Sequence, residues 1–213
     1  MTTRRLTAAR RGAVAAATVA AALVLAACGS DDSAGHAHHD MGGTSSASAT
    51  QGGHNAQDVA FARDMIPHHR QAVAMADLAP TRAASQDVKA LAAKIKQAQD
   101  PEIATMSGWL AGWGEKVPSP DASGMKGMEG MDHSGHSMPG MMSEADMGTL
   151  EKLSGTAFDT AFLEMMIGHH EGAIEMAKAE QTKGASGPAK QLAAAIVTAQ
   201  SAEIAQMNQM LGK

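Results

Sequence analysis

Apolar residues recur at helical spacing in four long segments of the chain. In the second segment they follow the three-four spacing of one helix face. Breaking residues separate the segments: Pro80 after the first, Gly114 with Pro118 after the second, and "KGASGP" after the third. We therefore expect helices at about 56–79, 86–112, 156–182 and 188–211, and a shorter one at 144–153.

The first pair of helical segments is repeated by the second pair at a constant offset. Adding 101 to each number from Asp58 to Gly112 gives the equivalent residue without any insertion, and 25 of the 55 pairs are identical. This is an internal duplication in which each half is one helical hairpin. Neither hairpin can bury its apolar stripe alone. We therefore expect an all-α fold, an up-down four-helix bundle whose hairpins are related by a pseudo-twofold axis.

The first 28 residues read as an export signal, in which four arginines precede an apolar run that ends in small residues. The run ends in "LAAC", which resembles the bacterial lipobox, so Cys28 is predicted to carry lipid and to anchor the protein to the outer face of the cell membrane. In a Gram-negative cell this face lies in the periplasm. The expected domains are a signal peptide at 1–27, a flexible tether at 28–55, a first hairpin at 56–114, a Met/His-rich flexible linker at 115–142, and a short helix with the second hairpin at 143–213, with 56–213 forming one bundle.

Composition excludes some functions. Without the four signal arginines the chain has 13 basic and 22 acidic residues, a net charge of −9, so we expect no nucleic-acid partner. The chain has one cysteine, so no disulfide can form within it. There are 17 methionines and 10 histidines but no tyrosine and three phenylalanines. Methionine and histidine are therefore far more frequent in this chain than the aromatic residues.

One duplicated segment contains two adjacent histidines between two methionines. It reads "MIPHHRQAVAMA" in the first half and "MIGHHEGAIEMA" in the second. At about 100° per residue, the two adjacent histidines lie on either side of the inward stripe, each beside a methionine. The pseudo-twofold axis should bring both sets face to face. Buried imidazoles need partners, and a metal ion is one. The candidate ligands are His68, His69, His169, His170, Met65, Met75, Met166 and Met176.

The types of donor atom in these side chains predict which metal is bound. Thioether with imidazole, and with no thiolate or carboxylate in register, favours a soft monovalent ion: Cu(I), with Ag(I) as a mimic. The Glu-x-x-His motifs of di-iron bundles are absent, and zinc gains little from thioethers. The alternative, in which the methionines fill the core and the histidines are structural, stays open. Auxiliary metal donors are expected in the low-complexity segments: Met125, Met128, Met131, His133, His136, Met138, Met141 and Met142 in the linker, and His36, His38 and His39 near the anchor.

The pattern "FxxxMIxHHxxAxxMA", followed by "LAxxIxxAQxxEIxxM", resembles the domain of unknown function 305 family. It occurs twice and covers roughly 57–211. The resemblance implies a ferritin-like four-helix bundle, export, a link to copper binding and copper resistance, and metal ligation by the eight candidate ligands. The second copy departs from the commoner "MIPHH" form, because Gly168 stands where proline would be.

Together these features predict an exported, lipid-anchored copper-binding protein that sequesters Cu(I) or hands it on, in copper homeostasis or resistance. A copper-handling protein is a candidate partner. We expect no enzyme, since no nucleophile with a base can be assembled and no carboxylate pair is evident in the repeated core. Two alternatives remain: a metal-dependent oxidoreductase, such as a cuprous oxidase on a ferritin-like bundle, and an interaction module that binds no metal.

Overall fold

The protein is described by a computed structural model that covers residues 53–120 and 138–213, all within one compact unit. The predicted signal peptide, Cys28 and nearly all of the predicted tether lie outside the described residues. Within those two ranges there are five helices and no strand. The helices are α1 (Ala56–Arg82), α2 (Gln86–Gly112), α3 (Glu144–Lys152), α4 (Gly155–Lys183) and α5 (Gly187–Met210).

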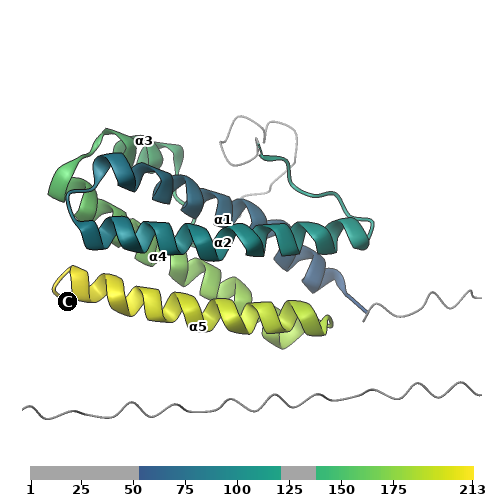
Figure 1. Ribbon diagram of the computed structural model, residues 1–213. Coiled ribbons are helices and arrows are strands. Elements are labelled where there is room, and N and C mark those ends of the chain that lie inside the picture. Colours follow the sequence, from purple (N-terminus) through teal and green to yellow (C-terminus); the bar gives the residue numbers. More distant parts are fainter. Residues whose placement is uncertain (1–52, 121–137) are drawn as a thin grey trace, which may run out of the picture. The chain divides into compact units, whose positions relative to one another are not determined.

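The four long helices form two hairpins, α1 with α2 and α4 with α5, which meet along α1 and α4 (Figure 1). The short helix α3 packs against both α1 and α4. The predicted all-α fold, a four-helix bundle built from two repeated hairpins, is confirmed. The two segments that carry the histidine pairs are therefore on the two helices that face each other.

Two aspartates at equivalent positions of the repeat fasten the hairpins together. Asp58, near the start of α1, accepts hydrogen bonds from the backbone amides of Ala185 (3.1 Å) and Ser186 (2.8 Å) in the turn between α4 and α5. Asp159, near the start of α4, accepts hydrogen bonds from Ala84 (3.1 Å) and Ser85 (2.9 Å) in the turn between α1 and α2. The start of each helix thus lies beside the end of the other, so α1 and α4 are antiparallel.

The core consists of two apolar clusters. One includes Leu91, Ile95, Leu150, Phe158 and Phe162, and the other includes Phe61, Ile66, Met106, Leu110 and Ile196. Along α1 and along α4, the change from one cluster to the other falls at the histidine pair. A polar layer therefore interrupts the core near its middle.

The end of α1 differs from the prediction. Pro80 was expected to end this helix, but α1 continues to Arg82 with Pro80 inside it. Proline removes only its own N–H from the helical ladder, and in the last turn the Ala83 amide still closes the helix on the carbonyl of Ala79 at 3.0 Å. The helix ends where Ala83 becomes extended.

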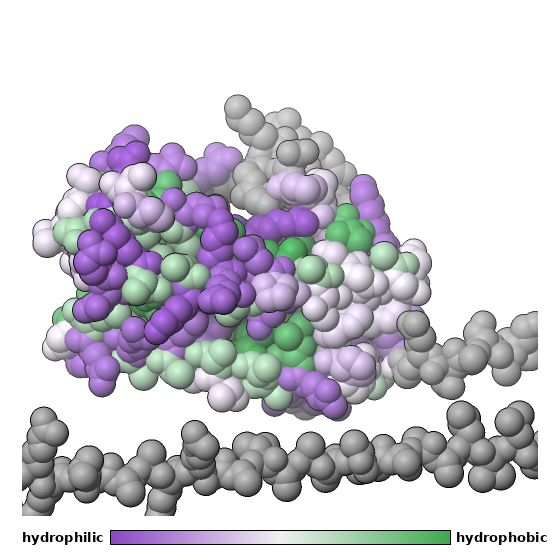
Figure 2. Space-filling view, in the orientation of Figure 1, coloured by the Kyte–Doolittle hydropathy of each residue, from purple (hydrophilic) through white to green (hydrophobic). Residues whose placement is uncertain are grey.

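On the face shown in Figure 2, strongly hydrophobic residues are visible only as small areas among polar ones. None of the helices described by the structure combines the length and the apolar character needed to cross a bilayer.

Candidate metal centre

The four histidines of the duplicated motif come together inside the bundle. His68, His69 and His170 are fully buried, and His169 is 1% exposed. The rings of His68 and His169 lie against each other, with their centroids 3.8 Å apart and their planes tilted by 37°. These two residues are equivalent in the repeat, so the expected meeting of the two halves is observed. We call the four residues the histidine layer.

Two of the histidines bind carboxylates. His69 Nε2 lies 2.7 Å from Glu102 Oε2, and His170 Nε2 lies 2.6 Å from Glu203 Oε2. Each glutamate side chain is 18% exposed. The same contact thus occurs in both halves, between the first and the second helix of each hairpin.

The prediction that no carboxylate is in register with the histidines is therefore wrong. It rested on positions along one helix, whereas Glu102 and Glu203 come from the neighbouring helices α2 and α5. The repeat did contain a signal, because the two glutamates are an identical pair in the aligned halves.

The end of the predicted linker, residues 138–142, packs on α1, and we call this segment the linker end. The carbonyl oxygen of Pro139 lies 3.1 Å from His68 Nε2. Gln71 forms two hydrogen bonds with the backbone of Met142: its amide nitrogen donates to the carbonyl at 2.9 Å, and its oxygen accepts from the Met142 amide at 2.7 Å. The linker end thus covers one side of the histidine layer.

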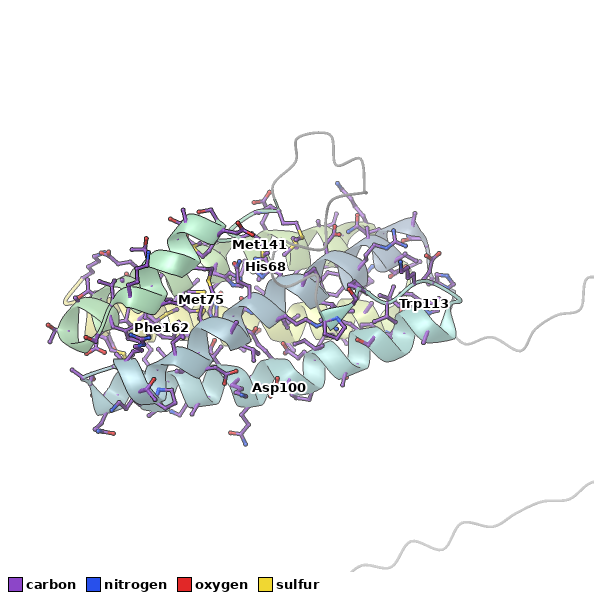
Figure 3. All side chains as sticks on the ribbon, turned by 90° about the horizontal axis from the view of Figure 1, so that it is seen from above. His68, Met75, Asp100, Trp113, Met141 and Phe162 are labelled. Atoms are coloured by element: carbon purple, nitrogen blue, oxygen red, sulfur yellow. The ribbon has the colours of Figure 1, made fainter. Side chains whose placement is uncertain are left out.

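A glycine on α4 leaves room for this contact. A Cβ atom on Gly172 would lie only 2.0 Å from the carbonyl oxygen of Pro139. Gly172 is equivalent to Gln71 in the repeat, so the halves differ at the position where both touch the linker end. In the view of Figure 3, Met141 of the linker end projects beside His68, whose Nε2 lies near the Pro139 carbonyl.

The beginning of the linker is attached to the same turn of α1. The guanidinium of Arg70 donates hydrogen bonds to the carbonyl oxygens of Pro118 (2.9 Å) and Ser119 (2.8 Å). Both described ends of the linker are therefore bonded to residues of α1 that directly follow His69, although 121–137, which carries most of the auxiliary donors, is outside the described residues.

Five ring nitrogens of the histidine layer are buried and lack a hydrogen-bond partner. The Nδ1 atoms of all four histidines are buried without a hydrogen-bond partner, and so is Nε2 of His169. Burial, followed by the charges of His69 and His170, lowers the pKa of His68 to about 3, against the weaker opposing effect of Pro139. Burial, and then the other three histidines, hold the pKa of His169 well below its usual value. Both rings are therefore neutral at pH 7, the form that binds metal.

The candidate methionines flank this layer. Met65, Met75 and Met166 are fully buried, and Met176 is partly buried. Met75 and Met166 belong to the cluster on one side of the layer, and Met65 and Met176 pack in the cluster on the other side. Sulfur atoms are thus supplied by both halves on both sides.

In the parts of the chain that the structure describes, no three His, Cys, Asp or Glu side chains are arranged to hold one ion. A metal in the histidine layer would therefore use methionine sulfur or fewer nitrogens. Ligation by the eight candidate residues stays a prediction.

Among the auxiliary donors, Met138, Met141 and Met142 are described, and all three are partly exposed. His54, at the end of the tether, stacks on Trp113 with the ring centroids 4.6 Å apart. The remaining auxiliary candidates lie outside the described residues: Met125, Met128, Met131, His133, His136, His36, His38 and His39.

A pair of interacting carboxylates, Glu180 and Asp58, lies away from the histidine layer and was not predicted from the sequence. Glu180 on α4 is fully buried, and burial together with the charge of Asp58 raises its pKa to about 8. Burial alone would raise the pKa of Asp58 as well, but interaction with Glu180 and hydrogen bonds from backbone amides lower it. The expectation of no carboxylate pair in the repeated core is thus wrong. Glu180 aligns with Ala79, so the repeat gave no indication of it.

Comparison with solved structures shows several similar proteins. A DUF305 protein of Streptomyces coelicolor, described as secreted, is 34% identical with a TM-score of 0.63, over 73% of this chain and 92% of that one. A DUF305 fragment from Deinococcus radiodurans is 30% identical with a TM-score of 0.63, over 74% and 97%. CopM in its Cu(II)-bound form is 34% identical with a TM-score of 0.59, over 72% and 94%. CopM is also solved in Cu(I)-bound, Ag-bound and apo forms.

No curated protein is similar enough to count as a relative. The sequence profile described as "Domain of unknown function (DUF305)" matches residues 58–211, which include both hairpins and the histidine layer. The chain belongs to the DUF305 family.

Proposed function

We propose that this protein is exported, is anchored by lipid at Cys28, and binds Cu(I) in order to sequester it or hand it on. The observation that carries the proposal is the histidine layer. Burial keeps the pKa of His68 and of His169 low, so these two rings are neutral, and five ring nitrogens of the layer are buried without partners. An unpaired buried polar atom destabilises a protein, and a metal ion would provide the missing partner.

Similar proteins support copper as the cargo. CopM, at 30–34% identity, has been solved with Cu(II), Cu(I) and Ag bound. For the present chain we propose Cu(I), because the methionines on both sides of the layer supply thioether sulfur, which prefers soft ions. The description of the Streptomyces coelicolor protein as secreted supports export.

We assign the linker the role of collecting ions. Its described ends are held on α1 by Arg70 and Gln71, the two residues that follow His69. Donors between these ends would stay near the histidine layer, which raises their effective concentration there. The bundle would hold the tight site, and the linker would add weaker ones.

A competition titration of Cu(I) against a chromophoric chelator tests the proposal, with bound metal identified by elemental analysis. Replacing His68, His69, His169 and His170 with alanine should remove the tightest binding. Replacing Met125, Met128, Met131, His133 and His136 with serine keeps the linker length and should lower only the stoichiometry.

Circular dichroism must first show that the four-histidine variant is helical. If it is not, the single variant His169→Leu replaces it in the titration. Uptake by a folded histidine variant with wild-type affinity would contradict the proposal, and so would loss of all uptake in the serine variant.

We propose a binding protein and not an enzyme, but one observation favours the oxidoreductase alternative. Glu102 and Glu203 place carboxylates beside the histidines, where a redox site could use them for proton transfer. Oxygen consumption at catalytic turnover after addition of Cu(I) would favour a cuprous oxidase. Uptake of a fixed number of ions without oxygen consumption would favour binding alone.

A further inference from the structure

Three ring nitrogens of the histidine layer each face an oxygen atom that can only accept a hydrogen bond. His69 Nε2 meets Glu102, His170 Nε2 meets Glu203, and His68 Nε2 meets the backbone carbonyl of Pro139. An ionised carboxylate and a carbonyl have no hydrogen to give. Each of these Nε2 atoms must therefore carry the hydrogen.

The opposite ring nitrogens lead to the same assignment. Nδ1 of His68, His69 and His170 is buried and has no hydrogen-bond partner. A hydrogen on Nδ1 would be a buried donor without an acceptor, which costs about 1–3 kcal/mol. The neutral ring with hydrogen on Nε2 and a lone pair on Nδ1 avoids this cost.

We propose that Glu102 and Glu203 are positioning residues, which hold His69 and His170 with hydrogen on Nε2 so that copper binds through Nδ1. The inference rests on the proposed function, because it names the nitrogen that the copper site uses. Histidines that bind metals usually donate their second N–H to a carboxylate or carbonyl, and loss of that partner weakens metal binding about 10- to 100-fold.

The two halves of the layer differ in this respect. Pro139 gives His68 an acceptor from the linker end, while both nitrogens of His169 lack a partner. The surroundings of His169 supply no carboxylate and no linker carbonyl at hydrogen-bond distance, and an interaction with the His68 backbone only weakly opposes the lowering of its pKa.

The tautomers can be read in the metal-free full chain. Long-range hydrogen–nitrogen correlation spectra of protein labelled with ¹⁵N-histidine should show protonated Nε2 and unprotonated Nδ1 for His69 and His170 at pH 7. Hydrogen on Nδ1, whether in the other neutral tautomer or in a cationic ring, would overturn the inference.

The glutamates are then tested by Glu102→Gln and Glu203→Gln. Glutamine keeps the size but loses the negative charge, and its amide can donate to Nε2 as well as accept from it, so the spectra should show the form with hydrogen on Nδ1 appearing beside the form with hydrogen on Nε2. Cu(I) affinity in the chelator competition should fall about 10- to 100-fold. Glu115→Gln is the matched control, since Glu115 pairs with Arg63 on the surface and should leave both readouts unchanged.

The wild-type protein titrated with Cu(I) separates this inference from the proposed function. Nitrogen shifts should change at Nδ1, and Nε2 should keep its hydrogen. Loss of the Nε2 hydrogen on metal binding would overturn the inference and leave copper binding intact. Absence of any copper uptake would overturn the proposed function and binding through Nδ1 with it.

Discussion

The imidazole ring of His68 lies against that of His169, with the centroids 3.8 Å apart. The two residues are equivalent in the duplication and come from facing helices, so the pseudo-twofold axis of the bundle passes close to this contact. Their surroundings are not equivalent. His68 meets the carbonyl oxygen of Pro139, whereas neither nitrogen of His169 has a partner.

This difference predicts opposite effects of leucine at two adjacent positions. His169→Leu removes two buried polar atoms that lack partners, and should raise the free energy of unfolding of the metal-free protein by about 1–2 kcal/mol. His170→Leu leaves Glu203 without its partner, and should lower the free energy of unfolding by about 1–3 kcal/mol. Urea denaturation without metal at pH 7 measures both values.

Because the two substitutions are chemically identical, each serves as the control for the other. Equal changes in the two variants would show that hydrogen bonding does not distinguish the two rings. Copper binding should weaken in both, since each variant loses a candidate ligand.

The meeting of His68 with His169 could be predicted from the sequence because it depends on the repeat. A constant offset with no insertion gives two equal hairpins, and a pseudo-twofold arrangement then brings equivalent residues together. The helix bounds were also predicted well, because breaking residues separate the apolar segments. The exception was the end of α1, because Pro80 is tolerated in the last turn.

The rest of the site could not be read from one helix. Glu102 reaches His69 from α2, across a contact that depends on how the hairpin closes. The linker end can pack on the histidine layer because Gly172 has no side chain to block Pro139. The sequence shows the glycine, but the close approach of Pro139 is known only from the structure. Glu180 also has no counterpart in the first half, where Ala79 takes its place.

Two glycines of α4 predict different results for the same substitution. Gly168→Ala meets no atom within 4 Å and should stabilise the helix by up to about 1 kcal/mol, because alanine is the better helix former. Gly172→Ala would place its Cβ against Pro139 and should displace the linker end. Hydrogen exchange at the Met142 amide, which is bonded to Gln71, should then become faster in Gly172→Ala and stay slow in Gly168→Ala.

Unchanged exchange in both variants would show that the linker end shifts without detaching. Detachment should also remove the partner of His68 Nε2. In the Gly172→Ala spectra we therefore expect a mixture of His68 tautomers.

The carboxylate of Asp159 predicts a large effect on stability at a site far from the histidines. Asp159→Ala removes the acceptor for the backbone amides of Ala84 and Ser85, and should lower the free energy of unfolding by about 2–3 kcal/mol. Asp87→Ala, in the exposed first turn of α2, is the control and should cost less than about 1 kcal/mol. Equal losses in urea denaturation would mean that the turn between α1 and α2 does not need Asp159.

Glu180 predicts how stability depends on pH. Its pKa is raised from 4.5 to about 8 in the folded protein, chiefly by burial. Between these two values the unfolded chain releases this proton while the folded protein keeps it. The folded state then binds more protons, so the contribution of Glu180 to stability falls as pH rises through this window, by on the order of 1 kcal/mol per pH unit, and levels off above pH 8.

The variant Glu180→Gln cannot ionise, so it should lose this dependence and be more stable than the wild type at pH 8. Urea denaturation at pH 5, 6, 7 and 8 gives the difference between the two proteins at each pH, which cancels the titration of all other groups. Glu175→Gln, at an exposed position of the same helix, is the control and should follow the wild type. A constant difference between Glu180→Gln and the wild type across the four pH values would mean that Glu180 is ionised in the folded bundle, and that Asp58 does not oppose its charge.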